Sequence, residues 1–107
     1  AVNMVKDSKI DFLIEKDKVP VLNNVLKLID YGMVPEGAYR NLKFFKDWID
    51  FSSAISEEEK LLLSDPQTSG GLLITLQEDK LEVFKRRGIF FCVIGRVIEG
   101  TGKIFFK

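Results

Sequence analysis

Histidine is absent from the sequence, and Cys92 is its single cysteine. Without histidine the chain lacks the commonest general base and the side chain found in many zinc sites. One cysteine excludes an internal disulfide and a cysteine-rich metal cluster. Cys92 lies in the apolar run Ile89–Ile94, which favours a buried thiol in a strand over a nucleophile, because reactive thiols need exposure and nearby positive charge. Acid–base chemistry here would require Asp, Glu, Lys, Tyr or Cys in a perturbed environment.

The sequence also lacks an excess of either charge and any apolar run long enough to span a membrane. Its 16 basic and 16 acidic residues cancel, which gives no reason to expect nucleic acid or an anionic membrane as partner. No signal peptide is recognisable, so the predicted location is the cytoplasm. With 46% apolar and 30% charged residues in a length of 107, the composition is typical of one soluble globular domain.

Apolar periodicity predicts the elements of the first half. Alternation in Lys9–Glu15 is typical of a strand. Helical spacing of apolar residues from Val21 onward ends near Gly32, a residue type that favours helix termination. Ser56–Glu59 has the pattern of a capping box, which predicts a short helix to about Leu63.

The second half combines one predicted helix with three predicted strands. Glu78–Arg87 has acids first and bases last, which matches the helix dipole, and Gly88 ends it. We expect strands at Gly71–Leu76 and Ile89–Ile98, with Gly95 as a bulge or close-approach point, and then a hairpin turn at Glu99–Gly102 with Lys103–Phe106 as the returning strand.

The order of these elements predicts an α+β fold. We expect a mixed or antiparallel sheet of about four strands with helices packed on one face. Residues 33–52 form a long connection, predicted as a loop followed by an irregular, partly helical segment held by aromatic residues. Phe105 and Phe106 are adjacent, as are Phe90 and Phe91, so both sheet faces carry aromatic side chains. An exposed aromatic surface is expected unless another part of the protein covers it.

The segment Asp65–Gly71, with the sequence Asp-Pro-Gln-Thr-Ser-Gly-Gly, is the most informative part of the chain. Asp-Pro ends the preceding helix, because proline lacks the N–H and disfavours a helical residue before it. Thr-Ser-Gly-Gly then supplies two hydroxyls and two residues free to adopt positive φ. Two interpretations are level at this point: a turn whose Asp and Thr satisfy backbone amides locally, or a loop that binds a ligand.

Asp65–Ile74 resembles the signature near the C-terminal end of the selenophosphate synthetases, also called selenide, water dikinases. Gly32–Asn41 resembles that family's Gly-x-x-Pro-Gly-Gly-Thr-x-x-Asn stretch, and Ile94–Val97 resembles its Ile-Gly-x-Val close. The order and separation of these segments also fit, so the resemblance covers nearly the whole chain. Glu36 and Ala38 stand where the family often has Gly and Thr, which weakens the case that Gly32–Asn41 binds phosphate directly.

The resemblance implies an enzyme that converts ATP, selenide and water into selenophosphate, AMP and phosphate, with Mg²⁺ as cofactor. It implies that residues 1–107 are a single C-terminal domain that lacks its first helix and the ATP-binding domain preceding it. In that family a homodimer forms mainly through the preceding domain. The catalytic Cys or selenocysteine, its Lys and the metal-binding aspartates also precede the matched part. We therefore expect no catalytic residue and no metal ligand in this chain, and no activity from it alone.

The resemblance also implies that this chain forms one wall of the active-site cleft. The residues expected to contact ATP are Thr68, Ser69, Gly70, Gly71, Arg40 and Asn41, with Asp65, Pro66 and Gln67 as a structural turn. Two alternatives stay open. One is a C-terminal domain from a related enzyme, such as aminoimidazole ribonucleotide synthetase, thiamine-monophosphate kinase or the hydrogenase-maturation dehydratase. The other is a non-catalytic interaction module whose aromatic face docks a partner chain.

Overall fold

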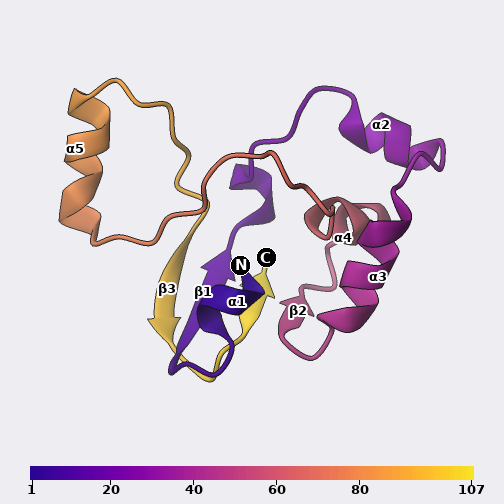
Figure 1. The fold of residues 1–107 in the computed structure, drawn as a ribbon, viewed down its shortest axis with the longest axis horizontal. Coiled ribbons are helices and arrows are strands. Elements are labelled where there is room, and N and C mark those ends of the chain that lie inside the picture. Colours follow the sequence, from indigo (N-terminus) through magenta and orange to yellow (C-terminus); the bar gives the residue numbers. More distant parts are fainter.

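A mixed sheet of four short strands forms the centre of the computed structural model, which describes residues 1–107 (Figure 1). The strands are β1 (Ile10–Ile14), β2 (Ile49–Phe51), β3 (Gly95–Glu99) and β4 (Ile104–Phe106). The helices are α1 (Val2–Val5), α2 (Val25–Asp30), α3 (Glu36–Phe44), α4 (Glu57–Leu63) and α5 (Leu81–Arg86), with 3₁₀ turns η1 (Lys16–Lys18) and η2 (Glu78–Lys80). The predicted α+β class and the mixed sheet of four strands are confirmed.

The strands are ordered β2-β4-β1-β3 across the sheet. β1 runs antiparallel to β3 and parallel to β4, and β4 runs parallel to β2. Gly95 lies opposite Ile14 in the β1–β3 pair. A Cβ at Gly95 would run into the carbonyl of Leu13, so the close approach predicted at this glycine is confirmed.

The predicted hairpin between β3 and β4 is wrong, because β1 lies between these two strands. The Gly-Thr-Gly turn crosses the end of β1: the Gly100 N–H donates to the Lys9 carbonyl at 3.0 Å and the Gly102 N–H to the Ile10 carbonyl at 3.2 Å. Glycines near a turn predict that the chain reverses, but they carry no information about which strands pair afterwards. The pairing depends on β1, which is remote in sequence.

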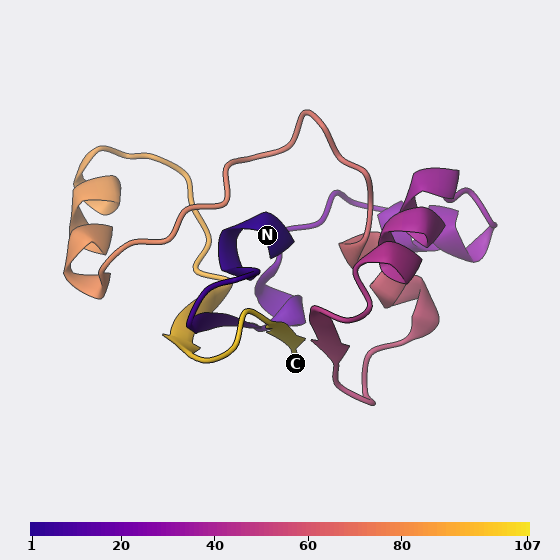
Figure 2. The ribbon, with the colours of Figure 1, turned by 60° about the horizontal axis from the view of Figure 1, so that its bottom comes forward.

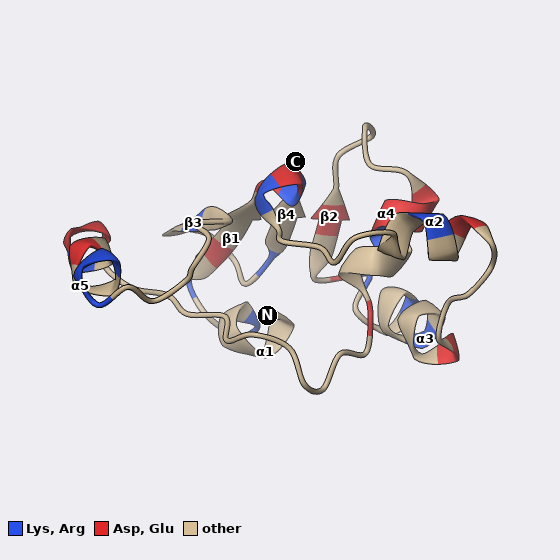
Figure 3. Cartoon of the chain, turned by 90° about the horizontal axis from the view of Figure 1, so that it is seen from above, with Lys and Arg blue, Asp and Glu red and all other residues tan.

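The core lies between α1 and one face of the sheet. Phe12 and Ile14 of β1 point to the same face because side chains alternate along a strand, and Ile104 and Phe106 of β4 are buried in the same way. Figure 3 shows α1 on one side of the row of strands. The buried core residues are Val2, Val5, Phe12, Ile14, Ile55, Ile104 and Phe106.

Three helices, α2, α3 and α4, gather beyond β2 (Figure 1). The connection predicted as irregular thus contains α3 and β2. Pro35 and Gly37 suggested a loop, but Pro35 is the N-cap of α3, at a helix start where proline is tolerated. α2 begins at Val25, later than predicted, and ends before Gly32, whose φ of +76° is that of a helix-terminating glycine.

The aromatic residues of this connection do hold it in place, as predicted. The Phe44 and Phe45 rings meet edge to face with centroids 4.9 Å apart, and the Phe45 and Trp48 centroids are 6.5 Å apart. Phe51 of β2 stacks on Phe106 of β4 at 5.2 Å. These contacts join the α2–α4 side of the molecule to the sheet.

Residues 67–94 form an arm that carries η2 and α5 away from the sheet (Figure 2). The helix predicted at Glu78–Arg87 is present as η2 and α5, and Gly88 ends it with φ +62°. The strand predicted at Gly71–Leu76 does not form, and β3 begins only at Gly95. β1 supplies just five residues for β3 to pair with, and an extended segment without a pairing partner does not form a strand.

Apolar side chains along this arm are exposed, with Leu72 90% and Phe90 85% accessible. Cys92 is also exposed and outside any strand, so the prediction of a buried thiol is wrong. The arm makes the chain more extended than usual: the radius of gyration is 14.6 Å, against about 13 Å expected for this length. The expected exposed aromatic surface is therefore present at Phe90, while Phe106 is buried in the core. No helix combines the length and the apolar character needed to cross a membrane.

Candidate functional site

The Asp65–Gly71 segment leaves the end of α4 as an exposed, extended chain. The capping box predicted for α4 is confirmed: the Glu59 N–H donates to Ser56 Oγ at 3.2 Å, and the Ser56 N–H donates to Glu59 Oε2 at 2.8 Å. The helix ends at Leu63, directly before Ser64-Asp65-Pro66, as the proline requires.

The polar side chains of this segment have no hydrogen-bond partner within the chain. Asp65 and Thr68 satisfy no backbone amide, so the self-satisfied turn considered from the sequence does not form. Gly70 and Gly71 do not adopt positive φ, and a Cβ at Gly71 would meet no atom within 4 Å. Because the segment is exposed, water can satisfy these groups, and the hydroxyls of Thr68 and Ser69 remain available to a ligand.

α3 holds the start of the segment at two points. The ring of Pro66 packs where Gly37 has no side chain: a Cβ there would lie 2.8 Å from Pro66 Cγ. One turn along the helix, Asn41 Nδ2 donates to the carbonyl of Ser64 at 3.0 Å. The two stretches that carry the family resemblance are therefore in direct contact, although about 25 residues separate them in sequence.

Arg40 lies on the same helix and is largely free. Its Nε is 4.0 Å from Glu36 Oε1, and both side chains are exposed, so this pair contributes little. Arg40, Asn41, Lys43 and Phe44 line an open hollow of about 580 Å³. The structure therefore places two cationic side chains beside Asn41, but no hydrogen bond or ion pair joins Arg40 to Thr68 or Ser69.

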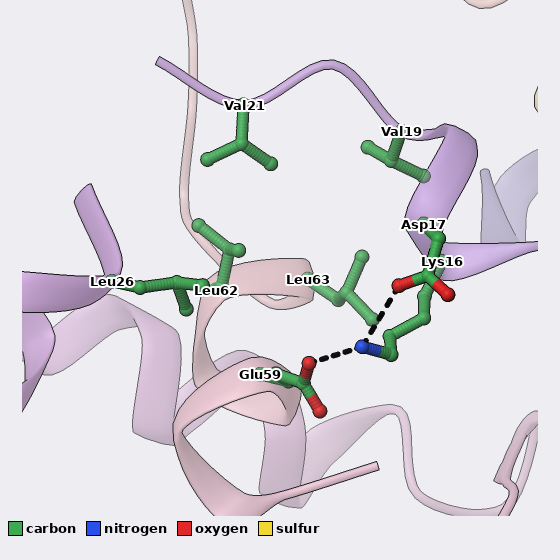
Figure 4. A pocket seen from close by; sticks show the side chains of 8 residues that line it. All are labelled: Lys16, Asp17, Val19, Val21, Leu26, Glu59, Leu62 and Leu63. Atoms are coloured by element: carbon green, nitrogen blue, oxygen red, sulfur yellow. Dashed lines mark hydrogen bonds and ion pairs between the residues drawn. The ribbon is translucent and has the colours of Figure 1, made fainter. Parts of the chain in front are cut away.

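A second hollow, of about 260 Å³, lies between η1, the start of α2, and α4 (Figure 4). Lys16 Nζ pairs with Glu59 and lies 3.0 Å from Asp17 Oδ1. The hydrogen bond to Glu59, followed by that to Asp17, raises the pKa of Lys16. Lys16 donates in turn to Glu59 and lowers the pKa of Glu59, with the Ser56 N–H as the next cause. Because two carboxylates already neutralise this lysine, it offers no free charge to an anionic ligand.

Asp11 is an organising residue that the sequence reasoning missed. Its Oδ1 accepts the backbone N–H groups of Thr101 at 2.8 Å, Gly102 at 2.9 Å and Lys103 at 2.8 Å. The hydrogen bond from the Lys103 backbone N–H is the largest cause that lowers the pKa of Asp11. Together with the bonds from Thr101 and Gly102, it outweighs the desolvation that would raise this pKa. The sequence did contain a sign of this role: Asp11 is an acidic residue inside an otherwise apolar strand, and the chain has a Gly-Thr-Gly turn whose N–H groups need acceptors.

The chain does not assemble a site for a divalent cation. No group of three or more carboxylate or cysteine side chains is arranged to hold a metal. Asp65, the one carboxylate in Asp65–Gly71, has no ion-pair partner beside it. Hard cations such as Mg²⁺ prefer several oxygen ligands, so the donor set of this chain does not fit such an ion.

Comparison with known proteins gives a consistent result. No family model matches the chain. It is 44% identical over 106 residues to a selenide, water dikinase of Citrifermentans bemidjiense, which covers 95% of this chain and 30% of the relative. The sequence matches a segment of the selenide, water dikinase family. A selenide, water dikinase of Campylobacter jejuni is 44% identical over 81 residues, 75% of this chain and 23% of the relative.

A third selenide, water dikinase, from Caldanaerobacter subterraneus subsp. tengcongensis, is 36% identical over 107 residues and again spans 92% of this chain but 30% of the relative. The chain thus covers about 30% of the length of these curated selenide, water dikinases. The family resemblance seen in Asp65–Ile74 and Gly32–Asn41 is confirmed.

Proposed function

We propose that this chain is the C-terminal domain of a selenophosphate synthetase. In the full-length enzyme, ATP, selenide and water would give selenophosphate, AMP and phosphate. The observation that carries the proposal is 44% identity to a selenide, water dikinase over 95% of the chain. The residues that complete the reaction would lie in the part of the relatives that this chain does not match, so the chain alone is expected to be inactive.

The role proposed for this chain is one wall of the ATP-binding cleft. Arg40 supports this because a guanidinium binds phosphate oxygens in a bidentate way and here has only a weak acidic neighbour. The free hydroxyls of Thr68 and Ser69 supply donors, and Gly70 and Gly71 leave room for a ligand to approach the backbone. Asn41 would contact ATP through the second N–H of its Nδ2, since the first already donates to Ser64.

Mg²⁺ would accompany ATP in the full-length enzyme, and its ligands would come from the part of the relatives that this chain does not match. A homodimer, formed through the part outside this chain, and a cytoplasmic location belong to the same proposal. The proposal rests on the relatives, which are named selenide, water dikinases.

The decisive experiment uses the full-length protein that contains residues 1–107. ATP, Mg²⁺ and selenide are supplied without oxygen, and AMP is followed by chromatography with selenophosphate followed by ³¹P NMR. We expect AMP and selenophosphate to form together and only when selenide is present. AMP or ADP release that ignores selenide would reject this function and favour another ATP-dependent enzyme.

A substitution of Arg40 tests whether this chain contacts ATP. Arg40→Ala in the full-length enzyme is expected to raise the KM for ATP by about tenfold, the equivalent of roughly 1.4 kcal/mol of lost binding. Arg96→Ala is the matched control, because Arg96 lies exposed on β3 and forms no ion pair. Equal KM values for Arg40→Ala, Arg96→Ala and the unmodified enzyme would remove Arg40 from the site.

A further inference from the structure

The contact between Gly37 and Pro66 depends on the absence of a side chain. A Cβ at Gly37 would lie 2.8 Å from Pro66 Cγ and 3.1 Å from Pro66 Cβ. Contacts of a Cβ below 3.0 Å are essentially absent from real proteins, and the proline ring cannot rotate away. Any larger residue at Gly37 must therefore push the start of the Asp65–Gly71 segment away from α3.

The contact of Asn41 lies on the same face of α3. Residues four apart in a helix are stacked one turn above the other, so Gly37 and Asn41 face the same neighbour. Asn41 Nδ2 reaches the Ser64 carbonyl at 3.0 Å, and Ser64 itself is buried with 8% of its surface accessible. This carbonyl lies at the end of α4, where the last carbonyls lack a partner within the helix.

Beyond Pro66 the segment has no comparable support. The side chains of Gln67, Thr68 and Ser69 form no hydrogen bond within the chain and are exposed. The direction in which Thr68–Gly71 leaves α4 is consequently set by residues 64–66. Arg40 stands on the helix that holds those residues, so Gly37 and Asn41 also fix the segment relative to Arg40.

We propose that Gly37 and Asn41 are positioning residues for the ATP site: they dock Ser64 and Pro66 on α3 and thereby place Thr68–Gly71 relative to Arg40. This proposal rests on the proposed function, since it assigns a role within that site. Gly37 itself is not expected to touch ATP. Gly37 acts only through the segment that it holds, whereas Asn41 holds the segment with one N–H of Nδ2 and keeps the other for ATP.

The test is a double-variant cycle in the full-length enzyme with Gly37→Ala, Pro66→Gly and the combination of both, because glycine at 66 removes both atoms that a Cβ at Gly37 would meet. Alanine is the better helix former, so without the contact Gly37→Ala would raise the thermal midpoint. With the Pro66 ring in place we expect the opposite, a lowered midpoint. In the Pro66→Gly background, Gly37→Ala is expected to raise the thermal midpoint. This reversal of sign reports the docking and does not require enzyme activity.

The second readout of the cycle is kinetic. Gly37→Ala is expected to lower kcat/KM for ATP by about tenfold or more, because a displacement of about 1 Å at a site can lower the rate by as much as a hundredfold. In the Pro66→Gly background the same substitution should leave kcat/KM unchanged. A sign reversal in stability with no kinetic effect of Gly37→Ala would overturn the positioning role, and the absence of a sign reversal would overturn the docking.

Asn41→Ala gives an independent test if Gly37→Ala fails to fold. We expect it to lower kcat/KM for ATP with a small change in thermal midpoint. Its matched control is Asn3→Ala, an exposed asparagine in α1 whose side chain forms no hydrogen bond. Identical kinetics for the two asparagine variants would overturn the role of Asn41. Failure of the unmodified enzyme to form AMP with selenide would reject the proposed function and the positioning role together, while the stability cycle would still report the docking.

Discussion

Asp11 shows how a single carboxylate organises the end of the sheet. It lies in β1 with 6% of its surface accessible and accepts three successive backbone N–H groups of the turn between β3 and β4. A buried carboxylate is unfavourable unless it is hydrogen-bonded, and three donors fully compensate for this burial. The side chain therefore ties the turn between β3 and β4 to β1, the strand that pairs with both of them.

Asp11→Asn is expected to lower the thermal midpoint by several degrees at pH 7, because the neutral amide accepts more weakly from the three N–H groups. The folded state lowers the pKa of Asp11, whereas unfolded Asp titrates near about 3.9. The stabilisation is therefore fully present above about pH 5 and is lost as the pH falls through the lowered pKa.

Thermal unfolding of the unmodified chain and Asp11→Asn between pH 7 and pH 2 checks this prediction. The difference between their midpoints should shrink as the pH falls. Subtracting the midpoint-against-pH curve of Asp11→Asn from that of the unmodified chain also removes the contribution of Glu58 and Glu59, whose pKa values are lowered too. Asp47→Asn is the control, since Asp47 is exposed without a partner. A midpoint difference that stays constant with pH would show that the charge of Asp11 is unimportant.

Gly102, in the same turn, is a position where both the backbone conformation and the available space favour glycine. Its φ is +92°, and a Cβ would lie 2.8 Å from the carbonyl of Val5 in α1. Gly102→Ala is expected to lower the free energy of unfolding by about 1–3 kcal/mol, the range for strained backbone positions. Urea unfolding measures it. Gly71→Ala, where a Cβ meets nothing within 4 Å, should leave the urea midpoint nearly unchanged, and equal effects of the two substitutions would contradict the geometry.

At the scale of elements, α4 joins the local and the long-range interactions of the fold. Its capping box satisfies N–H groups at its own start, while Glu59 also pairs with Lys16 of η1. Its last residues lead into the Asp65–Gly71 segment that α3 holds. A shift of α4 would consequently be transmitted to Thr68–Gly71.

Ser56→Ala removes the side-chain half of the capping box. We expect the free energy of unfolding to fall by about 0.5–2 kcal/mol, as for other N-cap residues. Chemical denaturation measures the change. Ser53→Ala serves as the control, because Ser53 is exposed and its hydroxyl forms no hydrogen bond. A loss of stability in Ser53→Ala as large as in Ser56→Ala would rule out capping as the cause.

For the whole molecule, the structure separates a packed part from an arm. The sheet, α1 and Ile55 contain the core, whereas residues 67–94 leave it and expose Leu72 and Phe90. The candidate site lies where these parts meet, at the junction of α3, α4 and the start of the arm. The chain spans about 30% of the length of the selenide, water dikinase of Citrifermentans bemidjiense, and an exposed wall is what the proposed function requires of it.

Gly71→Val in the full-length enzyme tests this arrangement. A Cβ at Gly71 would meet no atom within 4 Å and the segment is exposed, so the thermal midpoint should stay unchanged. Selenide-dependent AMP formation is expected to fall by about tenfold or more, because the side chain would occupy the space proposed for ATP. Ser53→Ala, remote from the site, provides the activity control. Unchanged turnover would mean that Gly71 lies outside the cleft.

Local features of the chain were predictable because their causes are local. The helix of α4 follows from its own capping box and from Pro66, and the ends of α2 and α5 follow from Gly32 and Gly88. The strand β1 follows from its alternating pattern. The partly helical character of residues 33–52 was predicted, but the start of α3 was assigned to a loop because Pro35 and Gly37 resemble loop residues. Pro35 is the N-cap of the helix, and Gly37 leaves room for Pro66.

The candidate site was predictable as a list of residues but not as an arrangement. The motifs identified Asp65–Gly71 and Gly32–Asn41 separately, and the relatives confirm the family resemblance. Only the packed structure shows that Gly37 and Asn41 hold Pro66 and Ser64, because this contact joins residues on different helices.

The sequence by itself determined the α+β class, the family resemblance and the termini of several helices, since composition, caps and motifs act over a few neighbouring residues. Tertiary structure alone decided that β1 lies between β3 and β4, that Asp11 closes their turn, and that no strand forms at Gly71–Leu76. These outcomes depend on which distant segments compete for the same hydrogen-bonding edge. Strand pairing is a property of the assembled sheet, so no single segment encodes it.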